Sequence, residues 1–180
     1  MSEKIIFPKW HEGTWWVTSV RQRAAWVRSS EAPWLDPFLW KFEVINEDER
    51  KYLLRVTYPE RPNSLSEQHE KYFDVFLSKD DFKFIEGILH IGENEIPMHH
   101  DFLATVFKNH PPGVDQTGSL GKERLLKGRL DRIFPEESLK TYTTRTPTGG
   151  IVVSSTALPF HLRIREANYS IELEAWFTKV

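Results

Sequence analysis

The strongest constraint on the fold of this chain is an alternation of apolar and polar side chains across residues 38–58. In the first half, apolar side chains share one side of an extended chain, and Lys41 and Glu43 lie on the other. The second half repeats the pattern after a polar run at residues 46–50. This arrangement predicts an antiparallel hairpin with one apolar and one polar face. The apolar members are Phe38, Trp40, Phe42, Val44, Tyr52, Leu54, Val56 and Tyr58.

An isolated hairpin is marginally stable in water, so further strands must cover its apolar face. The same alternation predicts strands at residues 72–77, 160–165 and 169–177, and residues 81–91 resemble a strand more than a helix. A run with apolar groups on both faces predicts a strand at residues 14–20, and a threonine-rich run followed by a turn signal predicts strands at residues 142–146 and 151–153. Residues 92–135 lose the alternation, and residues 101–108 have the apolar spacing of a short helix.

These patterns predict a mainly β protein, a single antiparallel β-barrel or curved half-barrel with one or two short helices. We expect residues 1–180 to form a single domain, because no flexible or strongly charged linker divides them. Residues 92–135 are expected to form an irregular or helical insertion that acts as a lid or plug.

The composition narrows the possible functions. The chain carries 24 basic and 26 acidic residues, a net charge of -2, and therefore has no general attraction for nucleic acid or anionic membranes. It has no cysteine, which excludes disulfides, thiolate metal ligands and cysteine nucleophiles and favours the cytoplasm. Since no apolar run has the length of a signal-peptide core or a membrane span, we expect a soluble protein.

A short run at the start of the first predicted strand, Gly13, Thr14 and Trp15, resembles the G-x-W element of lipocalins and their calycin relatives. The resemblance implies a barrel whose closed end is plugged by Trp15, beneath an arginine that Arg163 or Arg165 would supply. A second architecture fits about as well. It is the half-open antiparallel barrel of the LolA/LolB type, a curved sheet wrapped around a helical plug.

The seven tryptophans and the aromatic fraction of 13% suit either a large core or an aromatic-lined cavity. We expect a non-catalytic domain without a cofactor that binds an apolar or amphipathic small molecule in such a cavity. Residues 120–134 are predominantly basic and would hold the head group of an acidic ligand at the mouth. The expected ligand-binding residues are Trp15, Trp16, Trp40, Phe42, Tyr52, Leu54, Phe73, Phe160, Arg124 and Arg129.

Two other classes of function stay open. A protein–protein interaction or self-association domain, such as a homodimer, would expose Trp10, Trp26 and Trp34 on a docking patch. A metal-dependent enzyme would draw its ligands from a group of histidines that lack the i, i+4 spacing of a helical zinc motif, so we expect no metal site. These histidines are His90, His99, His100 and His110.

Overall fold

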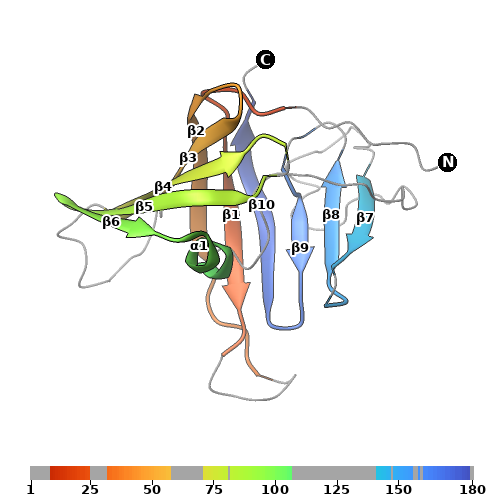
Figure 1. The fold of residues 1–180 in the computed structure, drawn as a ribbon. Helices are drawn as coiled ribbons and strands as arrows, with labels where there is room; N and C mark the ends of the chain where they lie inside the picture. The colour runs from red at the N-terminus through yellow and green to blue at the C-terminus, as the bar shows by residue number, and fades with distance from the viewer. Residues whose placement is uncertain are drawn as a thin grey trace. The chain divides into compact units, whose positions relative to one another are not determined.

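The computed structural model describes residues 9–24, 32–57, 71–80, 82–106, 141–146, 148–155, 158 and 160–178 (Figure 1). Its first five strands are β1 (Trp15–Gln22), β2 (Phe38–Glu47), β3 (Lys51–Thr57), β4 (Lys71–Ser78) and β5 (Phe84–Ile91). They are followed by β6 (Asn94–Met98), α1 (His100–Val106), β7 (Thr141–Arg145), β8 (Ile151–Ser155), β9 (Arg163–Arg165) and β10 (Tyr169–Phe177).

The predicted mainly β, antiparallel fold is confirmed, with one short helix among the described residues. The strands hydrogen-bond in the order β6-β5-β4-β3-β2-β1-β10-β9-β8-β7. Because β6 and β7 stand at the two ends of this order, the sheet is open and does not close into a barrel. Within the described chain, no helix is long and apolar enough to cross a bilayer.

The elements divide into two compact units, each with its own buried side chains. One, called the β2–β6 unit below, contains residues 10–17, β2 from Leu39 onward, β3 to β6, and α1. The other, the β7–β10 unit, contains the described part of residues 18–38, β7 to β9, and β10 through Ala175. Each unit is assembled from stretches that alternate along the chain, which is why no linker marks a division in the sequence. The expectation of a single domain stays a prediction.

The hairpin predicted at residues 38–58 is confirmed as β2 and β3, with Val44 opposite Leu54 in the register. Its turn is fixed by Asp48, whose Oδ1 accepts hydrogen bonds from the backbone N–H groups of Arg50 at 2.7 Å and Lys51 at 2.8 Å. An aspartate that bonds to the backbone two and three residues ahead stabilises a tight turn. The polar run therefore closes the hairpin and leaves the apolar residues on one face.

Residues 94–98 depart from the prediction of an irregular or helical insertion, because they form strand β6 and pair with β5. The turn between the two strands contains Gly92, whose φ of 58° is a left-handed conformation that glycine adopts without steric cost. The strand was missed because its apolar pattern consists only of Ile96 and Met98, with Pro97 between them. The helix predicted at residues 101–108 is confirmed as α1, and residues 107–135 lie outside the described residues.

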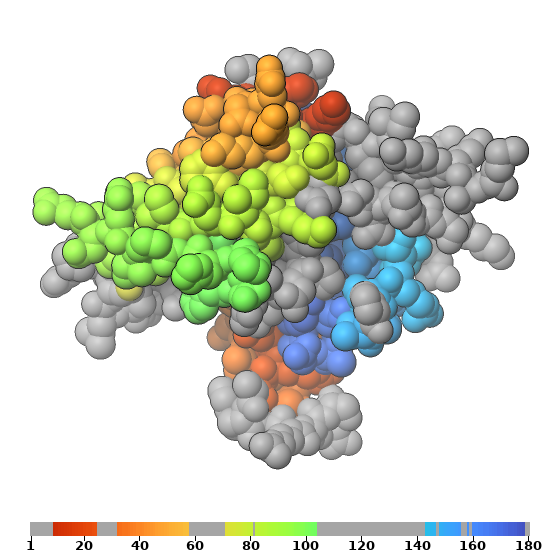
Figure 2. Space-filling view, viewed as in Figure 1, coloured from red at the N-terminus to blue at the C-terminus, as the bar shows by residue number. Residues whose placement is uncertain are grey.

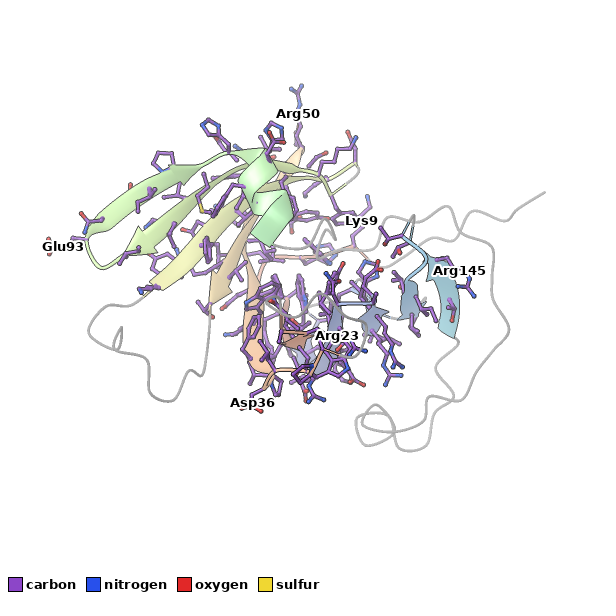
Figure 3. The ribbon with its side chains drawn as sticks, turned by 90° about the horizontal axis from the view of Figure 1, so that it is seen from below. Lys9, Arg23, Asp36, Arg50, Glu93 and Arg145 are labelled. Atoms are coloured by element: carbon purple, nitrogen blue, oxygen red, sulfur yellow. The ribbon has the colours of Figure 1, made fainter. Side chains whose placement is uncertain are left out.

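Helix α1 packs against β5 (Figure 3). The contact is close because position 87 has no side chain. A Cβ atom on Gly87 would lie 2.9 Å from Cδ1 of Leu103 and 3.2 Å from the carbonyl oxygen of Asp74. Glycine at this position therefore allows Leu103, which is fully buried, to rest directly on the strand.

The β7–β10 unit confirms the predicted C-terminal strands, although the strand expected at residues 160–165 is shortened to β9. Gly149, with φ of 86°, permits the turn between β7 and β8. Arg163 lies opposite Glu172 in the register and forms an ion pair with it. Arg165 lies opposite Ser170.

Candidate functional site

Several of the predicted binding residues lie together in the β2–β6 unit, where their rings contact one another. Trp16 stacks on Phe42 with 5.2 Å between ring centroids, and Trp40 meets Phe42 edge-on at 6.1 Å. Such ring pairs add to the stabilisation that their burial provides. These aromatic side chains therefore contribute to the core of the unit, together with the buried Leu54 and Phe73.

Trp10, predicted to be exposed on a docking patch, is fully buried. Its ring centroid lies 5.0 Å from that of Trp16, 5.1 Å from Tyr52 and 4.9 Å from Phe82. Phe82 has φ of 55°, a strained conformation for a bulky residue, and its ring stacks on Tyr52 at 6.0 Å. Residues before β1 and after β4 thus join one aromatic cluster, which the alternation within single strands does not reveal.

The remaining residues predicted for ligand binding, docking or metal binding are not part of this aromatic cluster. Trp15 points to the opposite side of β1 from Trp16 and is half-buried, with Nζ of Lys41 5.6 Å from its ring centroid. Phe160 is buried in the β7–β10 unit. Trp34 is half-buried, with the guanidinium of Arg23 4.5 Å from its ring centroid. The other predicted residues, Trp26, His110, Arg124 and Arg129, lie outside the described residues.

One row of apolar residues passes from the interior to the surface across the β2–β6 unit. Phe42, Val56 and Phe73, which are neighbours in the register of β2, β3 and β4, are 4%, 0% and 8% exposed. The row continues to Leu89 on β5, which is half-buried, and ends at Ile96 on β6, which is 46% exposed. The apolar face therefore extends beyond the part of the sheet that is buried.

The neighbouring row behaves differently because helix α1 covers it. This row runs through Leu54, Val75, Gly87 and Met98, and every member is buried. Leu103 of α1 lies directly over Gly87. The helix thus shields one row and leaves the end of the other at the surface.

Two more large apolar side chains are exposed on β5 and α1. Ile85, next to the register shift between β4 and β5, is 48% exposed, and Phe102 on α1 is 55% exposed. We call Ile85, Leu89, Ile96 and Phe102 the apolar surface. Figure 2 shows the elements that carry it, β5, β6 and α1, in green on the face turned to the viewer. Leu89 and Ile96 are direct neighbours in the register, and Ile85 and Phe102 are exposed on the same group of elements. Exposed apolar groups of this kind mark candidate binding surfaces.

The opposite face of the same strands carries a polar cluster formed by Arg55, Tyr72, Asp74, His90 and Glu95. Arg55 donates two hydrogen bonds to the two carboxylate oxygens of Asp74, each 2.8 Å long. Its guanidinium lies 4.3 Å from the centroid of the Tyr72 ring, which stacks on the His90 ring at 4.3 Å. The Nε2 atom of His90 is 3.3 Å from Oδ2 of Asp74, and Nδ1 is 3.6 Å from Oε1 of Glu95.

This polar cluster connects four neighbouring strands, β3 to β6. The hydrogen bonds to Asp74 raise the pKa of Arg55 above its ordinary value. Both nitrogens of the His90 ring lie within 4 Å of a carboxylate, although the buried Nε2 atom makes no hydrogen bond. The geometry suits a structural role better than acid–base catalysis.

The other histidines of the predicted metal group are placed apart from this cluster. His99 and His100 are exposed at the start of α1, and Nε2 of His100 is 2.9 Å from Oδ1 of Asp101. Among the residues that the structure describes, no three histidine, aspartate or glutamate side chains are arranged to hold a metal ion.

Comparisons with protein families, curated proteins and solved structures find no match to this chain. The resemblance to the G-x-W element therefore depends on the residues themselves. Gly13 has φ of 91°, and its N–H donates a 2.8 Å hydrogen bond to the carbonyl of Val44. Glycine is thus required where the chain enters β1.

Proposed function

We propose that this protein is a non-catalytic binding domain for an apolar or amphipathic small molecule, and that the apolar surface at β5, β6 and α1 is where the molecule binds. The observation that carries the proposal is the row from Phe42 to Ile96, which leaves the core and ends half-exposed. A ligand placed there would continue the core outward. As part of the same proposal, the protein is cytoplasmic and distantly similar to lipocalin-type or LolA/LolB-type ligand carriers.

The exposed apolar side chains would contribute a modest part of the binding free energy. Burying a large apolar side chain completely contributes about 1.5–3 kcal/mol. Since Ile85, Ile96 and Phe102 are each about half exposed, covering them contributes on the order of 1 kcal/mol each. Their sum of about 3 kcal/mol is below the roughly 4.1 kcal/mol that a dissociation constant of 1 mM corresponds to, so burial of the ligand's own apolar surface must supply the rest of the binding free energy.

The proposal is tested with an uncharged fluorescent dye such as Nile red, whose emission rises in an apolar environment. The double variant Ile96→Ser/Phe102→Ser should weaken dye binding at least about fivefold, because two apolar contacts are lost. The matched control is Ile151→Ser/Phe177→Ser, which removes side chains that are 39% and 51% exposed on β8 and at the end of β10.

Equal loss of dye binding in both double variants would contradict the assignment of the surface. Unchanged binding in Ile96→Ser/Phe102→Ser would do the same. A wild-type protein that does not enhance dye emission at all would contradict the function itself.

A protein–protein interaction domain that uses the same apolar surface is the alternative. Strand addition at the edge strand β6 is disfavoured, because Pro97 has no N–H to donate and Glu95 places a charge on the strand. A partner would therefore have to cover the face of the sheet. Concentration-dependent mass in light scattering, abolished by Ile96→Ser, would favour this alternative over a small-molecule ligand.

A further inference from the structure

The outer face of the β7–β10 unit carries a row of three residues, Arg145, Ile151 and Arg165, which we call the arginine row. Arg145 on β7, labelled in Figure 3, lies opposite Ile151 on β8, and Ile151 lies opposite Arg165 on β9. Residues directly opposite one another in neighbouring strands point to the same side of a sheet. The core is on the other side, with Val152 and Ile164. All three members of the row are exposed.

The two arginines of the row lack acidic partners. In the part of the chain that the structure describes, the side chains of Arg145 and Arg165 form no ion pair or hydrogen bond. Arg163, in the next row of the same face, differs because it lies opposite Glu172 and pairs with it at 2.5 Å. The position between Arg145 and Arg165 is occupied by an isoleucine, so their charges are not neutralised within the sheet.

The acidic residues closest in sequence to the row do not face it. Glu166 follows Arg165 and therefore lies on the side of Val152 and Ile164, where its carboxylate accepts a hydrogen bond from Thr148. Glu174 is on the outer face of β10, but four residues beyond the position opposite Arg165, which is about 13 Å along the strand. The surroundings of the arginine row are therefore positive.

The spacing of the two arginines suits an anion held between them. Their Cα atoms are two strand spacings apart, about 10 Å, and arginine side chains are long enough to converge above Ile151. An anion at this place would offset the repulsion between the two guanidinium groups. Ser170, opposite Arg165 at the end of the same row, adds a hydroxyl that can donate a hydrogen bond.

We propose that the arginine row binds the phosphate group of a small organic phosphate monoester, whose first carbons rest on Ile151. Such a phosphate carries close to two negative charges at neutral pH and has three oxygens that accept hydrogen bonds from both guanidinium groups. A carboxylate has one charge and two oxygens, which a single arginine already matches. The inference does not depend on the proposed function, because the row belongs to the β7–β10 unit.

The small number of free charges favours a small molecule over a polyanionic surface. Basic clusters that hold proteins on anionic lipids typically contain about four to eight lysines and arginines. Nucleic-acid binding likewise depends on many phosphate contacts. Ile151, which is 39% exposed, offers too little apolar area to hold an uncharged ligand, so binding at the row depends on the phosphate.

The inference is tested by NMR of the ¹⁵N-labelled full chain in phosphate-free buffer of low ionic strength, titrated with butyl phosphate, inorganic phosphate and pentanoate. Butyl phosphate should shift the amide resonances of residues 143–145, 151–153 and 163–165 most. It should bind about fivefold tighter than pentanoate, because the second arginine gains a partner. It should bind about threefold tighter than inorganic phosphate, because its chain contacts Ile151.

Two variants locate the site. Arg145→Gln/Arg165→Gln should weaken binding of butyl phosphate at least about tenfold. The matched control, Arg50→Gln/Lys71→Gln, removes two exposed positive charges in the β2–β6 unit and should weaken it less than about twofold.

The variant Ile151→Ser should retain binding of inorganic phosphate and lose the additional affinity for butyl phosphate. This result would place the carbon chain on the isoleucine. Unequal loss of inorganic phosphate binding would show instead that the substitution disturbs the arginines, and would contradict the assigned pose.

The outcomes that overturn the inference are distinct. No binding of butyl phosphate, equal binding of pentanoate, or equal weakening in the control variant would remove the phosphate site. Equal binding of inorganic phosphate to the wild-type protein would identify the free ion as the ligand and end the case for a monoester. Arginine-dependent binding to vesicles that contain phosphatidate, without a response to butyl phosphate, would assign the row to a lipid surface.

Discussion

At the scale of single residues, Asp74 is the side chain on which the polar face of the β2–β6 unit most depends. It accepts both hydrogen bonds from Arg55 and lies 3.3 Å from the His90 ring. Its side chain is 13% exposed, whereas that of Arg55 is 37% exposed. If the pair were broken, water could therefore solvate the charge of Arg55 more easily than that of Asp74. The pair joins β3 to β4 and fixes their register.

We predict that Asp74→Asn lowers the free energy of unfolding by about 1–3 kcal/mol, because two cationic or polar partners lose their carboxylate. Urea denaturation measures the change. Glu43→Gln is the control, since Glu43 pairs with Lys41 where both side chains are more than a third exposed, and it should cost less than about 0.5 kcal/mol. Equal effects of the two substitutions would contradict this account.

Tyr169 provides a prediction about alkaline pH. Burial, with a smaller contribution from the charge of Glu166, raises the pKa of Tyr169 to about 12. The pKa of an unfolded tyrosine is about 10, so the folded chain keeps a proton that the unfolded chain loses between these values. The stabilisation is complete below about pH 10 and is lost as the pH rises toward 12.

The variant Tyr169→Phe should therefore lose less stability than the wild type between about pH 10 and 12. The measurement is the free energy of unfolding from urea titrations at several pH values, compared between the two proteins. Parallel pH profiles would show that this phenol does not ionise with the expected shift.

At the scale of elements, alternation predicted most strands because it reports which side of a strand is buried. It located the β2–β3 hairpin and the strands that became β4, β5 and β10, while turn signals and apolar or threonine-rich runs located β1, β7 and β8. It missed β6, where Pro97 interrupts a pattern of only two apolar residues. It also could not place Trp10, because burial of that ring depends on contacts with residues far along the chain.

The contact of α1 with β5 is an element-scale feature that can be tested by a double-mutant cycle. Gly87→Ala should destabilise the protein by about 1–3 kcal/mol, because the new methyl group would overlap Cδ1 of Leu103. Leu103→Ala should cost about 2–5 kcal/mol by opening a cavity.

The double variant Gly87→Ala/Leu103→Ala should lower the free energy of unfolding by less than the sum of the two single variants, and the difference should be about 0.5 kcal/mol or more. The added methyl group then occupies space that the leucine vacated. Additive effects in urea denaturation would show that Leu103 does not rest on this glycine.

At the scale of the whole molecule, the strand order and the division into two units were beyond the sequence. Pairing between strands far apart in the chain depends on contacts that alternation within one strand does not encode. The candidate site shows the same limit. Single residues such as Ile96 were visible as apolar, but only the register shows that they continue a buried row to the surface.

The central claim is that the surface formed by β5, β6 and α1 binds an apolar ligand. The most direct measurement follows the backbone amide resonances of the ¹⁵N-labelled protein by NMR during titration with octanol, which carries no charge. The account predicts that the largest shift changes fall on residues 84–106, centred on Leu89, Ile96 and Phe102. Largest changes on β7 to β9, or none above those caused by an equal concentration of methanol, would contradict it.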